Sequence, residues 1–234
     1  MKRLLYKKYG FTLAETLITL GIIGVVASLT MPTLIQHHKK VETSSRLKKF
    51  YSMMNQAIIM SEADNGSARD WVKAPTQYDS EGDIDYEAQG RVSKEFFMKY
   101  LAPYLKYTHI TDGENIIDKD GNKSGTATTV YLADGSSFSF HNGYCFDVIF
   151  DINGISKGPN QSSRDRFTFL LCQGNYIDSL CLNHYRPFCS YNIDLGKNPS
   201  REKRLAKCKN QGAWCSGLLE IDGWEFKDDY PYKL

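Results

Sequence analysis

The stretch Gly10-Phe11-Thr12-Leu13-Ala14-Glu15-Thr16-Leu17 decides how the N-terminal part of this chain is built. The leader before it, residues 1–9, is short and carries four basic residues, Lys2, Arg3, Lys7 and Lys8. An apolar segment follows as far as Ile35, and Glu15 is its only charged residue. A carboxylate near the middle of a membrane helix costs roughly 2.5–3.5 kcal/mol on insertion scales. Solubility and packing do not explain such a residue, so we expect Glu15 to have a specific role.

The apolar segment is long enough to cross a membrane. Residues 11–35 number 25, of which 15 are apolar and two are glycine. A helix of that length spans roughly 37 Å, against a hydrocarbon core of about 30 Å. The basic leader predicts a cytoplasmic N-terminus and an extracytoplasmic remainder. Two alternatives are a secretory signal peptide cut near Ser28-Leu29-Thr30 and a plain signal anchor. The apolar segment is longer than the core of a usual signal peptide, and neither alternative explains why Glu15 is present.

These residues resemble the prepilin signature of type IV pilins and type II secretion pseudopilins. The resemblance rests on the basic leader, on the residues Gly10, Phe11, Thr12, Leu13 and Glu15, and on the hydrophobic run, and it covers residues 7 to about 35. In that family a membrane-embedded peptidase cuts after the glycine and methylates the new terminal phenylalanine. The resemblance therefore implies cleavage between Gly10 and Phe11, an N-methylated Phe11, and Glu15 as the fifth residue of the mature chain.

The resemblance also implies how the segment is used in assembly. In filaments of this family the glutamate lies close to the terminal amine of a neighbouring subunit, and opposite charges attract strongly in a low dielectric. Gly24 and Pro32 lie where pilins often carry helix-loosening residues. Because proline removes a backbone donor, we expect a broken or bent helical ladder near Ser28. Simple tolerance of Gly24 and Pro32 in a membrane helix is the alternative.

Past a polar collar, residues 36–40, the pattern predicts that the same helix continues. Apolar side chains recur at helical spacing, namely Leu47, Phe50, Tyr51, Met54, Ala57 and Ile58. A sheet is the expected cover for this stripe, and Asn65-Gly66 is the expected stop. We therefore predict one helix over about residues 12–64. The domain boundaries follow as a removed leader (1–10), a membrane half (11–35), an amphipathic half (36–64) and an extracytoplasmic pilin-like domain (65–234).

The rest of the chain predicts a small antiparallel sheet. An acidic run over residues 79–87 reads as a solvated loop, and Ser93 reads as the cap of a helix that Pro103 ends or bends. Residues 128–132 and 137–140 flank Asp134-Gly135 and predict a hairpin. Further strands are expected over 144–152 and 166–172. Three to four strands after a long helix give an α+β fold with a cysteine-rich C-terminal region.

Six cysteines lie in the last 90 residues, at Cys145, Cys172, Cys181, Cys189, Cys208 and Cys215. An even number in an exported domain predicts disulfides, with 15 possible connectivities. Zinc is the alternative, because His184 lies between Cys181 and Cys189, but there is no C-x-x-C pair and export favours oxidation.

One loop offers a possible cation site, and no other cofactor is expected. Residues 151–160 and 164–167 resemble a loop of many pilin-like proteins, and the oxygens of Asp151, Asn153 and Asp165 could hold calcium, as some pseudopilins do. Calcium needs six to eight oxygen ligands, so three side chains would need backbone and water as well. Turn formation by Asp and Asn explains the same letters.

Charge and motifs narrow the function. Without the leader the chain has 25 Lys and Arg against 27 Asp and Glu, which argues against bulk nucleic-acid binding. The motifs H-E-x-x-H, the P-loop and G-x-G-x-x-G are absent from the sequence. The resemblance predicts a non-enzymatic subunit of a type IV pilus or type II secretion pseudopilus, and the bulky cysteine-rich domain favours a minor subunit. Its partners would be other pilin or pseudopilin subunits, the prepilin peptidase and the inner-membrane assembly platform. The alternative is an exported enzyme or receptor tethered to the membrane.

Overall fold

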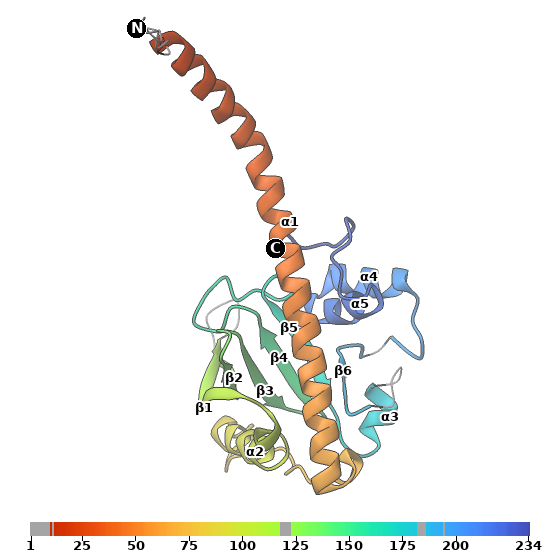
Figure 1. Cartoon of the computed structure of the whole chain (residues 1–234). Helices are drawn as coiled ribbons and strands as arrows, with labels where there is room; N and C mark the ends of the chain where they lie inside the picture. Colours follow the sequence, from red (N-terminus) through yellow and green to blue (C-terminus); the bar gives the residue numbers. More distant parts are fainter. Residues whose placement is uncertain (1–9, 11, 118–122, 182–185, 194) are drawn as a thin grey trace, which may run out of the picture.

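The computed structural model describes residue 10 and residues 12–117, 123–181, 186–193 and 195–234. One helix dominates it: α1 runs from Leu13 to Asn65, 53 residues, and matches the predicted span to within one residue at each end. Gly66, with φ of 77°, ends the helix where Asn65-Gly66 predicted a stop. The first half of α1 projects beyond the domain, and the second half crosses the sheet (Figure 1).

The sheet has six antiparallel strands in sequence order. The strands are β1 (Tyr107–Ile117), β2 (Lys123–Leu132), β3 (Ser137–Asn142), β4 (Phe146–Asp151), β5 (Arg166–Leu171) and β6 (Phe188–Ser190). The predicted hairpin is β2–β3, with Val130 opposite Phe138, and β4 and β5 occupy the other two predicted strand positions. The prediction missed β1 and β6, but the α+β class with a long helix on a small antiparallel sheet is confirmed.

Short helices surround the sheet. They are η1 (Ala68–Asp70), α2 (Tyr86–Tyr100), η2 (Ala102–Tyr104), α3 (Tyr176–Leu180), α4 (Arg201–Asn210), η3 (Gly212–Trp214) and α5 (Cys215–Ile221). The predicted start of α2 is wrong. Asp85 caps it, through a hydrogen bond from the Ala88 N–H, whereas Ser93 lies inside the helix with its hydroxyl donating to the Gln89 carbonyl.

The core lies between the amphipathic half of α1 and one face of the sheet. The predicted stripe residues Leu47, Phe50, Met54, Ala57 and Ile58 are buried, which confirms the stripe. Period-two alternation places the sheet's phenylalanines opposite them, at Phe138, Phe140, Phe146, Phe150, Phe167 and Phe169. Phe50 lies at the centre of this core, and its ring stacks on that of Phe150 with centroids 4.0 Å apart.

Candidate assembly surface

The N-terminal half of α1 is not covered by any of the residues that the structure describes. Its best 18-residue window has a mean hydropathy of 2.0, and none of that window is buried inside the structure. Large apolar side chains here, such as Leu17 and Leu29, are 62 % and 73 % exposed. A core helix of a water-soluble domain would hide such side chains. The exposed apolar surface is therefore consistent with a membrane anchor.

The first turn of α1 holds Glu15 in a capping box. The backbone N–H of Thr12 donates to Glu15 Oε2 at 2.8 Å, and Thr12 Oγ1 accepts from the Glu15 N–H at 3.2 Å. The Thr12 hydroxyl also donates to the same carboxylate oxygen at 2.8 Å. Reciprocal bonds of this kind satisfy two donors that a helix N-terminus otherwise leaves open. Glu15 thus has a local structural role, which the sequence analysis missed although Thr-x-x-Glu before an apolar run is a capping signal.

The other predicted residues of this segment lie as follows. Gly10 is exposed just before the helix, while Phe11 lies outside the described residues. The helix assignment continues without interruption past Gly24 and Pro32. Figure 1 shows the upper half of α1 curving gently away from the line of the lower half. The roles of Gly10 and Phe11 in processing, of Glu15 in assembly, and of Gly24 and Pro32 in helix loosening stay predictions.

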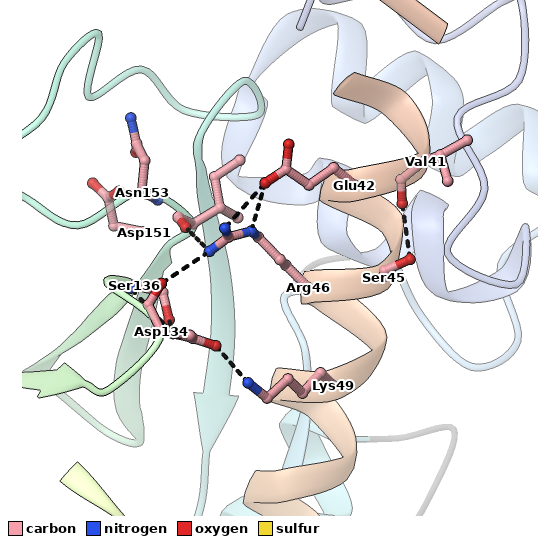
Figure 2. Close-up of polar contacts among 10 residues, drawn as sticks. Val41, Glu42, Ser45, Arg46, Lys49, Asp134, Ser136, Asp151 and Asn153 are labelled. Carbon is pink, nitrogen blue, oxygen red and sulfur yellow. Dashed lines mark hydrogen bonds and ion pairs between the residues drawn. The ribbon is translucent and has the colours of Figure 1, made fainter. Parts of the chain in front are cut away.

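Polar contacts join α1 to the sheet where the helix enters the domain (Figure 2). Arg46 Nη1 donates to the Ile152 carbonyl at 2.9 Å, and Lys49 Nζ donates to Asp134 Oδ2 at 2.6 Å. Desolvation opposes ionisation of Asp134, but hydrogen bonds from Lys49 and Ser136 prevail and lower its pKa to about 2. Asp134 lies in the β2–β3 turn and Ile152 follows β4, so these contacts link the helix to two neighbouring loops at the same end of the sheet. Nothing in the sequence predicts these contacts, because the partners lie more than 80 residues apart.

A second link joins α1 to the C-terminal region. The Tyr51 hydroxyl donates to Glu220 Oε1 at 2.8 Å, and the Ser190 hydroxyl donates to the other oxygen of the same carboxylate. Burial, together with the nearby Glu220 charge, raises the pKa of Tyr51. The Trp224 ring packs against Tyr51, with centroids 5.0 Å apart. The C-terminal helices are therefore fixed to α1 as well as to the sheet.

All six cysteines form disulfides, as predicted. Cys145 pairs with Cys172, Cys181 with Cys189, and Cys208 with Cys215. The first bridge joins the start of β4 to the end of β5, the second joins α3 to β6, and the third joins α4 to α5. Because each thiol is used, the zinc alternative through these cysteines is wrong. His184, which suggested the zinc alternative, lies outside the described residues.

The predicted calcium residues lie together, but their carboxylates bind protein groups. Asp151 accepts from Arg166 Nε at 3.0 Å and from the Asn153 N–H at 3.2 Å. Asp165 accepts from the N–H groups of Asn160 and Gln161, at 2.7 and 2.6 Å. Burial raises the pKa of Asp151, and the Arg166 guanidinium opposes that rise. This arrangement fits turn chemistry rather than a calcium site, so calcium binding stays a prediction without structural support.

Comparisons with known proteins agree with this geometry. A model described as "Prokaryotic N-terminal methylation motif" matches residues 5–31, and a model described as "Family of unknown function (DUF6613)" matches residues 33–234. No curated protein and no solved structure matches the chain. The first match supports a type IV pilin-like or pseudopilin precursor and suggests a structural protein, which implies processing by prepilin peptidase and assembly with other pilin subunits. The chain belongs to the family of unknown function DUF6613, and it begins with a prepilin signal of the type IV pilin kind.

Proposed function

We propose that the chain is a structural subunit, of the minor kind, in a type IV pilus or type II secretion pseudopilus. The prepilin peptidase would remove residues 1–10 and methylate Phe11, and the assembly platform would then move the subunit from the inner membrane into the filament. The observation that carries the proposal is α1 itself. One uninterrupted helix places its apolar half outside the domain and its amphipathic half in the domain core.

A helix built in this way needs two successive environments. The bilayer covers the apolar half before assembly, and the helices of neighbouring subunits cover it afterwards. Glu15 would meet the terminal amine of a neighbour in the second environment, and this ion pair would fix the axial register of the helices. The rigid attachment of the lower half, through Phe50, Lys49 and Tyr51, lets the domain follow the helix into the filament.

The C-terminal region supports the minor role. The helices α4 and α5, which the Cys208–Cys215 disulfide joins, enlarge the domain on one side of α1 (Figure 1). Added bulk is harder to repeat along a whole fibre than to place once or a few times. A cysteine-bounded surface of this kind is suited to meeting a partner outside the cell rather than to catalysis.

The test is the location of the mature protein. In cells that carry the full assembly machinery, we expect shearing to release the chain together with filaments, and mass spectrometry to show N-methylated Phe11 as its first residue. Detection only in the membrane fraction, with an enzymatic or ligand-binding activity that does not need the machinery, would instead establish the tethered enzyme or receptor.

A further inference from the structure

Two of the three disulfides lie against each other. The Sγ atoms of Cys172 and Cys181, which belong to different bridges, are 3.8 Å apart. Because both sulfurs are disulfide-bonded, neither carries a hydrogen, and the two atoms are in van der Waals contact. A disulfide bond is about 2.0 Å long, so these sulfurs need to move only about 1.8 Å closer to become bonded to each other. The two bridges therefore form one cluster of four sulfur atoms.

Apolar side chains enclose this cluster. All four cysteines of the two bridges are at most 4 % exposed. Leu170 on β5 and Ile177 on α3 belong to the same buried cluster. Protein interiors are close-packed, so a sulfur released from one bridge stays beside the other bridge. The third bridge, Cys208–Cys215, lies in a separate buried cluster with Leu218, and that cluster contains no further cysteine among the described residues.

Contact between sulfurs of different bridges permits exchange between them. A thiolate breaks a disulfide by attacking one sulfur, and the other sulfur leaves as a thiolate. A free Cys172 lies beside Cys181, and attack there forms a Cys172–Cys181 bond and releases Cys189. A free Cys181 lies beside Cys172, and attack there forms the same bond and releases Cys145. Both routes end with one product, which has a Cys172–Cys181 disulfide and a thiol on each of the two outer cysteines.

From this geometry we propose that the four cysteines act as a single thiol–disulfide exchange unit. An external thiol that opens either bridge forms a mixed disulfide with an outer cysteine, Cys145 or Cys189, and the released inner thiolate attacks the neighbouring bridge. A second external thiol then resolves the mixed disulfide. Two external thiols are oxidised to one external disulfide, and one protein disulfide is reduced to two protein thiols.

The exchange would change the surface at one end of the sheet. The Cys145–Cys172 bridge fixes the β3–β4 turn, which carries Tyr144 with 76 % of its surface exposed. The Tyr144 ring lies 5.5 Å from that of Tyr176 on α3, between centroids. In the exchanged product α3 is tied to the end of β5, and the β3–β4 turn has no covalent tie. The surface formed by Tyr144 and Tyr176 would thus respond to thiols, whichever bridge is opened first.

The first test needs no external reductant. Cys145→Ser leaves Cys172 as a free thiol beside the Cys181–Cys189 bridge. The full-length variant is kept in detergent micelles at about pH 8 overnight, because uncatalysed rearrangement takes minutes to hours. It is then denatured and labelled with N-ethylmaleimide at mildly acidic pH, where exchange is slow, and peptide mapping locates the label.

The label should divide between two cysteines of the Cys145→Ser variant. Both pairings use the same buried cluster, so we expect at least about a tenth of the label on Cys189 and the remainder on Cys172. Label on Cys172 alone would overturn the proposal. The reverse variant, Cys189→Ser, frees Cys181 and should place label on Cys145 as well, so the two variants test the contact from both sides.

Cys208→Ser is the matched control. It frees Cys215, which lies in the separate cluster, so the label should stay on Cys215 alone. A similar spread of label in this variant would mean general scrambling rather than exchange through contact, and would overturn the proposal.

Wild-type protein tests the response to an external thiol. After treatment with reduced glutathione, acid quenching and alkylation, we expect a Cys172–Cys181 linked peptide with alkylated Cys145 and Cys189. Thiols on a native pair, or both native bridges intact while Cys208–Cys215 is reduced, would contradict the proposal.

These measurements need the folded domain but no filament. The exchange and the proposed function can therefore fail independently of each other.

Discussion

The Glu15 carboxylate accepts a hydrogen bond from the backbone N–H of Thr12 at 2.8 Å, within the first turn of its own helix. The residue that the prepilin resemblance assigns to pairing between subunits therefore also closes the helix N-terminus. A capping box contributes on the order of 1 kcal/mol to a helix. Substitution by alanine removes both roles at once, so an experiment on Glu15 has to separate the charge from the cap.

Processing depends on Gly10. Gly10→Glu should leave a full-length precursor in the membrane fraction, because any side chain at this position would obstruct a peptidase that cuts after glycine. Among the described residues, no atom beyond its chain neighbours lies within 4 Å of a Cβ added at Gly10, so the substitution disturbs no contact there. The measurement is intact mass: a wild-type terminus after Ser28 or later would restore the secretory signal peptide.

Phe50 joins α1 to the sheet, and Phe50→Ala should lower the free energy of unfolding by about 3–5 kcal/mol. The side chain is 1 % exposed and contacts four other phenylalanines, Phe138, Phe150, Phe169 and Phe188. Urea unfolding in detergent micelles, followed by tryptophan fluorescence, checks this. Ile59→Ala is the matched control, because Ile59 is on the same helix but 63 % exposed. Similar losses for both variants would contradict the observed orientation of the helix.

The disulfides should differ in their contribution to stability. Bridges at sequence separations of 27 and 7 close loops of different length. The chain-entropy relation gives roughly 3.6 kcal/mol for Cys145–Cys172 and roughly 2.5 kcal/mol for Cys208–Cys215. Double serine variants, compared by urea unfolding, test the order. Alkylation of unreduced wild-type protein should find no thiol, and several reactive thiols would contradict the pairing.

The contact between Lys49 and Asp134 predicts a dependence of stability on pH. The pKa of Asp134 is lowered to about 2 in the folded chain, against about 3.9 when unfolded. The contribution of the ionised Asp134 to the free energy of unfolding is therefore fully present above pH 4 and is lost as pH falls toward 2. The pair is partly exposed, so Asp134→Asn should cost no more than about 1 kcal/mol at pH 7 and almost nothing near pH 2. A cost that persists at pH 2 would show that the charge is not its source.

The sequence predicted the elements that depend on long, regular patterns. The apolar run and the stripe from Leu47 to Ile58 define α1, and alternation over residues 128–140 defines the β2–β3 hairpin. It missed β1, because Asp112-Gly113-Glu114-Asn115 are typical turn residues. Pairing with β2 incorporates them through a register shift between Thr111 and Glu114. Tertiary pairing outweighs local preference there.

The other wrong predictions concern the start of α2, which depends on helix capping. The acidic run suggested a loop, yet Asp85 caps α2 and Glu87 lies in its first turn, where acidic groups are favourable. Ser93 resembled a cap but lies buried within the helix. In the candidate assembly surface, the capping interaction between Thr12 and Glu15 could be predicted from their spacing in the sequence. The contacts of Lys49 and Tyr51 could not be predicted, because their partners are 85 and 169 residues away in the sequence.

The most direct test of the account measures filament entry of three variants after shearing and blotting. Glu15→Gln keeps a capping side chain at residue 15 but removes its charge. Thr12→Ala removes the capping hydroxyl but keeps the Glu15 charge. Glu15→Ala removes both the capping side chain and the charge of residue 15. All three should insert in the membrane and be cut after Gly10. We predict that Glu15→Gln enters filaments as poorly as Glu15→Ala, while Thr12→Ala enters nearly as well as wild type. If Glu15→Gln enters as well as wild type and Thr12→Ala does not, Glu15 acts as a helix cap and the proposed charge pairing between subunits is wrong.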